Sequence, residues 1–187
     1  MWGWWVGLLA RLGRIDRLKE LFEENGAHPV DGGAFYSLYE RSIGAAQRMV
    51  RDPGQTFGCG SLAVGNVAEQ LGLAMDKVHE IRQLRSPDTG FSMSQLVDLA
   101  AEYQVDLVAV RRTRDTELVA PSVVHWKSDH YAAIIEIDGA YCRVVDPTFG
   151  RPKWLRTDYV NEEASGNFLV PASALLESEF LSILNRQ

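Results

Sequence analysis

Cys59 is the residue of this chain best placed to act as a nucleophile. It lies between two glycines in the stretch Gln55–Ser61 (QTFGCGS), directly before a segment with a helical pattern. The partial positive charge at a helix N-terminus favours a thiolate over a thiol, and glycines leave room for a substrate to approach. The sequence therefore predicts a nucleophilic cysteine, provided that another segment supplies a base.

His130 and Asp146 are the candidate base and its orienting partner. His130 begins an apolar strand, where a titratable group needs either a partner or a function, the alternative being a core histidine bonded to a backbone carbonyl. Asp146 ends the next strand, directly before Pro147. The order Cys59, His130, Asp146 therefore matches a nucleophile, a base and an orienting carboxylate.

Contact between His130 and Asp146 depends on the register of the hairpin that joins their strands. A two-residue Asp138-Gly139 loop would pair Asp146 with Tyr131 and turn His130 to the opposite face. A three-residue loop over 137–139, with Gly139 left-handed, would pair Asp146 with His130 itself. The catalytic hypothesis therefore predicts the three-residue loop.

Three further polar groups near these positions have expected roles. Asp129 is a weaker candidate for the orienting carboxylate, because neighbouring strand residues point to opposite faces. An oxyanion needs hydrogen-bond donors about 3 Å away, and the candidates are the backbone N–H of Cys59 and the side-chain amide of Gln55. Cys142 is expected to be a buried, inert thiol on the face that it shares with Ala132, Ile134 and Val144.

Composition bounds the class of protein. The 187 residues are 46% hydrophobic, with 19 basic and 25 acidic side chains, which gives a net charge of −6. A chain of this kind can bury a core, and it lacks the basic patch that nucleic-acid binding requires. Two distant cysteines do not make a disulfide framework, so we expect a reducing compartment. No cofactor is indicated, and neither cysteine has the Cys-x-x-Cys partner that would favour a zinc site at His125 and His130.

The apolar start of the chain, Met1–Ala10, does not predict a membrane anchor. It is too short to span a bilayer, and it lacks the basic region and the cleavage site of a signal peptide. We therefore expect a cytoplasmic protein that makes no membrane contact through this chain.

The first part of the chain predicts helices. Apolar residues recur at helical spacing over 2–24, with a stop at Gly26, and again over 34–50. This pair resembles either the end of a helical repeat array, so that the chain would be a piece of a larger protein, or a helical cap on the next domain. The turn cluster Arg51–Gly54 suggests a boundary, with a helical segment over 1–52 and a second domain over 53–187.

The second part changes from helices to strands. We expect helices from Cys59 to about residue 71, over 75–84, and over 92–103 with a capping box at Ser92 and Gln95. Strands are predicted over 105–111, 122–126, 131–137, 140–145 and 167–170, followed by a helix from Ser173. The order predicts an α+β fold, with N-terminal helices packed on a C-terminal antiparallel sheet.

Several motifs together resemble the bacteriocin leader-processing cysteine peptidases, the papain-like domains usually fused to bacteriocin-exporting ABC transporters. The resemblance spans residues 55–171. Its motifs are Cys59-Gly60-Ser61-Leu62-Ala63, the segment Thr89–Leu96, Val123-Val124-His125-Trp126 with Asp129-His130-Tyr131, and Arg143-Val144-Val145-Asp146-Pro147.

The resemblance implies a papain-like fold and cleavage of a peptide or protein substrate after small residues, such as Gly-Gly. It carries over Cys59, His130 and Asp146 as the triad and Gln55 as the oxyanion donor. Two departures from the family pattern affect this site. The glutamine usually lies further upstream of the cysteine, and Gly58 replaces the usual Asp or Thr.

Two other functions fit the same residues. A transglutaminase-like acyl transferase also uses Cys, His and Asp in this order, with an Asp-Pro-Thr that matches Asp146-Pro147-Thr148. A catalytically degenerate domain of the same fold would bind leader peptides or partner proteins without cutting them, and the displaced Gln55 favours that alternative.

Overall fold

The computed structural model describes residues 2–24, 32, 36–112, 116–175 and 182–183. Its helices are α1 (Trp2–Arg11), α2 (Ile15–Glu24), α3 (Tyr36–Arg51), α4 (Pro53–Thr56), α5 (Cys59–Gln70), α6 (Met75–Gln83), α7 (Met93–Glu102), α8 (Thr157–Glu163) and α9 (Ala172–Leu175). Its strands are β1 (Leu107–Arg111), β2 (Ser122–Trp126), β3 (His130–Asp138), β4 (Tyr141–Val145), β5 (Lys153–Arg156), β6 (Ala164–Pro171) and β7 (Ser182–Ile183).

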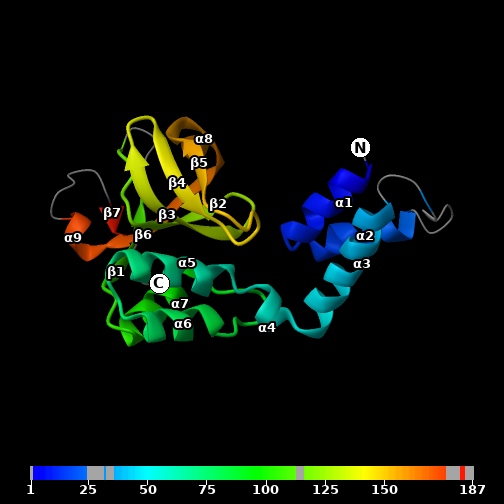
Figure 1. The fold of residues 1–187 in the computed structure, drawn as a ribbon, viewed down its shortest axis with the longest axis horizontal. Coiled ribbons are helices and arrows are strands. Elements are labelled where there is room, and N and C mark those ends of the chain that lie inside the picture. Colours follow the sequence, from blue (N-terminus) through cyan, green and yellow to red (C-terminus); the bar gives the residue numbers. More distant parts are fainter. Residues whose placement is uncertain (1, 25–31, 33–35, 113–115, 176–181, 184–187) are drawn as a thin grey trace.

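The N-terminal helices form a group that lies beside the rest of the molecule (Figure 1). The prediction of one helix over 2–24 is wrong, because Gly13 adopts a left-handed φ of +67° and separates α1 from α2. The predicted stop at Gly26 and the predicted start of the next helix at Ala34 lie outside the described residues. The three helices bury a small core of their own, made of Val6, Leu9, Ala10, Leu18 and Ala46.

Three helices, α5, α6 and α7, form a layer that follows the N-terminal group in the chain. The helix that begins at Cys59 is confirmed, and Gly72 with a φ of +85° reverses the chain after it. The capping box of α7 is also confirmed. Ser92 Oγ accepts a hydrogen bond from the Gln95 backbone N–H at 3.2 Å, and Gln95 Oε1 accepts one from the Ser92 N–H at 2.8 Å.

The sheet is antiparallel, with the strand order β5-β4-β3-β2-β6-β1-β7. The five predicted strands are all present, and β2 has the predicted bounds. The sequence did not predict β5 and α8, because β5 is short and mostly exposed and lacks the alternation of apolar and polar residues that marks a half-buried strand. The predicted C-terminal helix is present only as α9, and residues 176–181 lie outside the described residues. Its continuation is wrong at Ser182–Ile183, which form the short strand β7.

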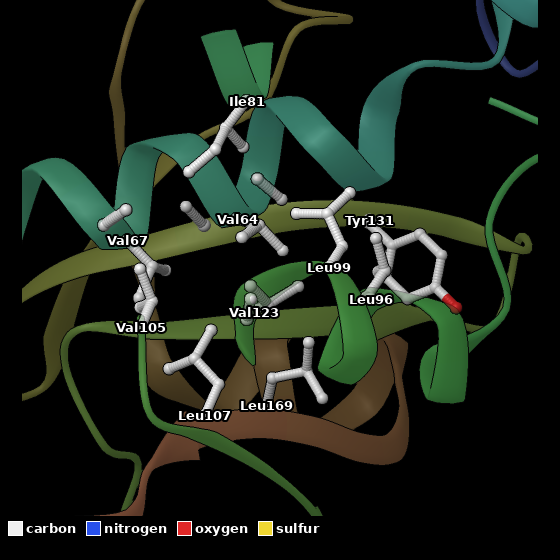
Figure 2. Packing of buried hydrophobic residues seen from close by; sticks show 14 of the residues in the cluster. Val64, Val67, Ile81, Leu96, Leu99, Val105, Leu107, Val123, Tyr131 and Leu169 are labelled. Atoms are coloured by element: carbon white, nitrogen blue, oxygen red, sulfur yellow. The ribbon is translucent and has the colours of Figure 1, made fainter. Parts of the chain in front are cut away.

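Both faces of the central strands are buried. On one face, α5 and α7 pack against the sheet through residues that include Val64, Leu96, Leu99, Val123 and Leu169 (Figure 2). The opposite face forms a second core with Val124, Ile134, Cys142, Val144, Val160 and Phe168. This arrangement fixes the first turn of α5 relative to β3, the two elements that carry Cys59 and His130. No helix among the described residues is both long enough and apolar enough to cross a bilayer.

Candidate active site

Cys59 is the first residue of α5, and its side chain is half-buried. Its backbone N–H lies in the first helical turn, where no intrahelical acceptor is available. The close packing of Gly60 fixes this turn, because a Cβ at Gly60 would lie 2.9 Å from Leu96 Cδ2 and 3.3 Å from Phe91 Cβ. The fold therefore places the thiol at the N-terminus of α5, where the backbone N–H of Cys59 can donate.

His130 and Asp146 form a buried hydrogen-bonded pair. His130 Nε2 lies 2.8 Å from Asp146 Oδ1, and the two residues are 9% and 6% exposed. The Cys59 thiol approaches the same imidazole closely enough to interact with it. Since Nε2 is bonded to Asp146, Nδ1 is the ring nitrogen that remains for the thiol. The structure thus brings together the three residues that the sequence singled out.

The hairpin that makes this contact differs from the one predicted. A two-residue loop, Gly139-Ala140, connects Asp138 to Tyr141, and a bulge at Ile135 shifts the register. The prediction of a three-residue loop over 137–139 is therefore wrong, although Gly139 is left-handed as expected, with a φ of +53°.

The bulge has the same effect on facing as the predicted loop. The predicted and the observed hairpin both have three unpaired residues. In the observed hairpin, two of them form the loop and the third is the bulged residue Ile135. The register Ala133↔Val145 places Asp146 opposite Ala132, two residues from His130 and therefore on the same face. A β-bulge inserts one extra residue, and no side-chain pattern in this strand marks it, so it could not be predicted from the sequence.

Thr148 is a member of the site that sequence reasoning missed. Its backbone N–H donates to Asp146 Oδ1 at 2.8 Å, and its Oγ1 lies 3.1 Å from His130 Nε2. An aspartate that accepts a bond from the N–H two residues later is a common turn, so Asp146-Pro147-Thr148 could have indicated it. Thr148 thus helps to hold both the carboxylate and the imidazole.

The two buried partners shift each other's pKa in opposite directions. Burial works to lower the pKa of His130, but the hydrogen bond to Asp146 and the interaction with Cys59 outweigh it and raise that pKa to about 9. Burial works to raise the pKa of Asp146, but the bonds from His130 and Thr148 outweigh it and hold that pKa below its usual value. The geometry therefore favours a charged imidazolium–carboxylate pair at neutral pH.

Cys142 and Asp129 lie where the sequence predicted. Cys142 is fully buried among apolar residues, and burial raises its pKa to about 11, so it is an inert thiol. Asp129 forms an ion pair with Arg14 at 3.4 Å, whereas the carboxylate that pairs with His130 is that of Asp146.

His125 and His130 do not converge on a common site. His125 lies opposite Tyr131 and packs on its ring with the centroids 4.8 Å apart, so it faces away from His130. Its Nδ1 lies 2.9 Å from Ser165 Oγ. Across the part of the chain that the structure describes, no group of three or more His, Cys, Asp or Glu side chains could hold a metal ion.

Gln55, the fourth predicted site residue, is more exposed than the other three. It is in the short helix α4, one turn before Cys59, and its side chain is exposed. Gly58, which replaces the usual polar residue, is the N-cap of α5, so no side-chain hydrogen bond caps this helix. The role of Gln55 as an oxyanion donor stays a prediction.

A largely apolar cavity of about 590 Å³ adjoins the His130–Asp146 pair. Its walls come from β2, β3, β4, β5 and α8, and from the turn between α1 and α2. Besides His130, Asp146 and Thr148, the lining includes Leu12, Trp126, Val144, Phe149 and Tyr159. The cavity gives the buried pair a neighbouring space large enough for a side chain of a bound peptide.

Comparison with known proteins identifies the central part of the chain. The sequence model of the peptidase C39 family matches residues 52–174, about two thirds of the chain. A comparison with curated proteins found no match. The family match, together with helices packed on an antiparallel sheet, confirms the papain-like α+β class predicted from the sequence.

Solved structures similar to the chain include three peptidase domains. One is a double glycine motif protease from an AMS/PCAT transporter in complex with the leader peptide (16% identity, 60% of this chain, 81% of that chain, TM-score 0.49). Another is the N-terminal peptidase C39 like domain of a toxin secretion ATP-binding protein from Vibrio parahaemolyticus (16%, 59%, 93%, 0.46). The third is the peptidase domain of Streptococcus ComA, a bi-functional ABC transporter involved in quorum sensing (18%, 62%, 93%, 0.48).

Proposed function

Because the chain belongs to the peptidase C39 family, we propose that it is a cysteine peptidase that cleaves peptides after a pair of small residues, such as Gly-Gly. The observation that carries this proposal is the arrangement of three side chains. His130 is bonded through Nε2 to the buried Asp146, and its other side meets a cysteine at a helix N-terminus.

The proposed reaction begins from a Cys59 thiolate beside the His130 imidazolium, which holds the proton that the thiol has lost. The thiolate then attacks the carbonyl carbon of the scissile bond, and the imidazolium returns the proton to the leaving amine. Water, with His130 as base, hydrolyses the resulting thioester and releases the new carboxylate. Asp146 keeps the imidazole oriented throughout, and Thr148 holds Asp146.

The negative oxygen of the intermediate needs donors that are already in place. The backbone N–H of Cys59 is one, because the first turn of α5 offers it no acceptor within the helix. We propose Gln55 as the second, since it precedes Cys59 by one turn. Its side chain is exposed on α4, where it is accessible to a bound substrate.

The test is digestion of a peptide library with all products read by mass spectrometry. We expect the wild-type protein to cut peptides after Gly-Gly and the Cys59→Ala variant to lose this activity, a loss of at least about a thousandfold for removal of a nucleophile. Cys142→Ala is the matched control, because this second cysteine is buried away from the site. Unchanged cleavage by Cys59→Ala would refute the proposal, and transfer of an amine to glutamine without cleavage would favour an acyl transferase.

A peptide-binding domain without catalysis is the second candidate, and the exposed position of Gln55 favours it. A peptide with a thiol-directed electrophile distinguishes the two. If the site is active, the electrophilic peptide should label Cys59 at neutral pH. It should label the His130→Ala variant much more slowly. Equal labelling of the two proteins, with retained peptide binding, would support the binding domain.

A further inference from the structure

The turn between α1 and α2 contacts the candidate site, although it lies outside the part of the chain that matches the peptidase family. Leu12, Gly13 and Arg14 make up this turn, and each contacts a different part of the site. Leu12 lines the cavity that also contains His130 and Asp146. The end of α1 next to the sheet is visible in Figure 1.

Gly13 contacts the segment that leads into the nucleophile. A Cβ at Gly13 would lie 2.7 Å from Cε1 of the Phe57 ring, closer than real Cβ contacts allow, so the ring packs directly on the glycine backbone. Phe57 ends α4 and precedes Cys59 by two residues. The left-handed φ of Gly13 further disfavours any other residue there.

Arg14 contacts the segment that leads into the base. Its Nη1 lies 3.4 Å from Oδ2 of Asp129, the residue directly before His130. Asp129 has a φ of +56°, a conformation that aspartate tolerates better than most residues do, and it shapes the turn from β2 into β3. The ion pair is exposed, so by itself it contributes little and is weakened by salt.

We propose that the α1–α2 turn is a positioning element that holds the entry to α5 against the entry to β3, and so sets the distance between Cys59 and His130. Cys59 and His130 come from different layers of the fold, and each is preceded by a residue that the turn contacts. Productive geometry between two catalytic groups tolerates only small displacements. Only the expected effect on catalysis rests on the proposed function; the effect on the geometry of Cys59 and His130 does not.

Two variants and one matched control test the proposal in the full-length protein. Gly13→Ala forces a side chain against Phe57, and Arg14→Gln removes the ion pair with Asp129. Arg17→Gln is the control, because Arg17 is a nearby exposed arginine on α2 that pairs with Glu20. The readout is the rate at which iodoacetamide alkylates Cys59 at pH 7, which requires no substrate, measured together with peptide cleavage.

We expect Gly13→Ala to lower the alkylation rate by roughly tenfold or more, as a small misplacement of reacting groups does. Arg14→Gln should lower it by about two- to threefold in low salt and not in high salt, as expected for an exposed pair. Arg14→Lys should keep the wild-type alkylation rate, because it keeps the ion pair. Adding Asp129→Asn to Arg14→Gln should not lower the rate further. Arg17→Gln should match the wild type.

A second measurement distinguishes positioning from general destabilisation. In an NMR titration, the pKa of His130 should fall in Gly13→Ala, because part of its elevation comes from Cys59. Wild-type alkylation rates and an unchanged His130 titration in folded Gly13→Ala would overturn the proposal. Faster cleavage or faster alkylation would also overturn it, since the turn would then obstruct the site. If the variants behave as expected and no peptide is cut, the positioning role stands and the proposed peptidase activity fails.

Discussion

His130 depends on two partners for its charge. Asp146 and Cys59 both favour the imidazolium form, and together they outweigh the burial that opposes it. A histidine whose pKa in the folded protein lies above its unfolded value contributes stability that is fully present below about pH 6.5 and is lost as the pH rises through about 9. The same deprotonation removes the positive charge that would stabilise a neighbouring thiolate.

We therefore expect the melting temperature to decrease between about pH 6.5 and 9, and peptide cleavage to decline as the pH rises through about 9. Asp146→Asn should move the decline to lower pH, because the imidazolium loses its carboxylate partner. Asp138→Asn is a suitable control, since this exposed carboxylate lies in the same hairpin, at its far end. Cleavage and melting profiles between pH 5 and 10 would check this. A decline at the same pH in all three proteins would contradict it.

The helix α5 depends on the absence of a side chain at Gly60. Leu96 is fully buried and cannot move aside, so Gly60→Ala should push the first turn of α5 away from α7. We expect a loss of about 1–3 kcal/mol in the free energy of unfolding and a reduced cleavage rate. Gly44→Ala is the matched control, because its Cβ would meet only the end of Arg48 at 3.6 Å, and it should gain up to about 1 kcal/mol. Denaturant unfolding would measure both, and equal effects of the two substitutions would exclude the packing argument.

The sequence predicted those elements whose signals are local. The capping box of α7, the strand β2 with its β-branched and aromatic residues, and the helix that begins at Cys59 were all confirmed. The break at Gly13 was missed, because the apolar period continues across it from Leu9 to Leu18 and hides a conformation that only the backbone shows. The bulge at Ile135 was missed because it depends on how two strands pair.

The candidate site was predicted to a similar extent. Cys59, His130 and Asp146 were recognisable because a nucleophile, a base and a carboxylate each occupied the end of an expected element. Thr148 was missed as a contact because only the turn after β4 brings it to His130. No sequence signal pointed to Leu12 or Arg14, since their place at the site follows from how the N-terminal helices dock.

At the scale of the whole molecule, the N-terminal helices have a core that is separate from the two cores of the sheet. The predicted boundary at residue 52 implies that this group unfolds on its own. Leu18 is fully buried there, so Leu18→Ala should cost about 2–5 kcal/mol and lower one of two thermal transitions. Ile134→Ala, in the sheet, should lower the other. Calorimetry would check this, and a single transition that both variants lower equally would mean that the two parts unfold together.

The bulge at Ile135 makes the hairpin sensitive to whether its length is odd or even. If the turn keeps two residues and the bulge is kept, deleting one residue from the Gly139-Ala140 loop would place Asp146 opposite Ala133, on the other face of the sheet from His130. Deleting Ile135 instead would remove the bulge and leave Ala132 opposite Asp146, so the side chains of His130 and Asp146 would still share a face. With a two-residue turn, this hairpin can therefore change its length by one residue during evolution and keep the His130–Asp146 contact only if the bulge is lost as well.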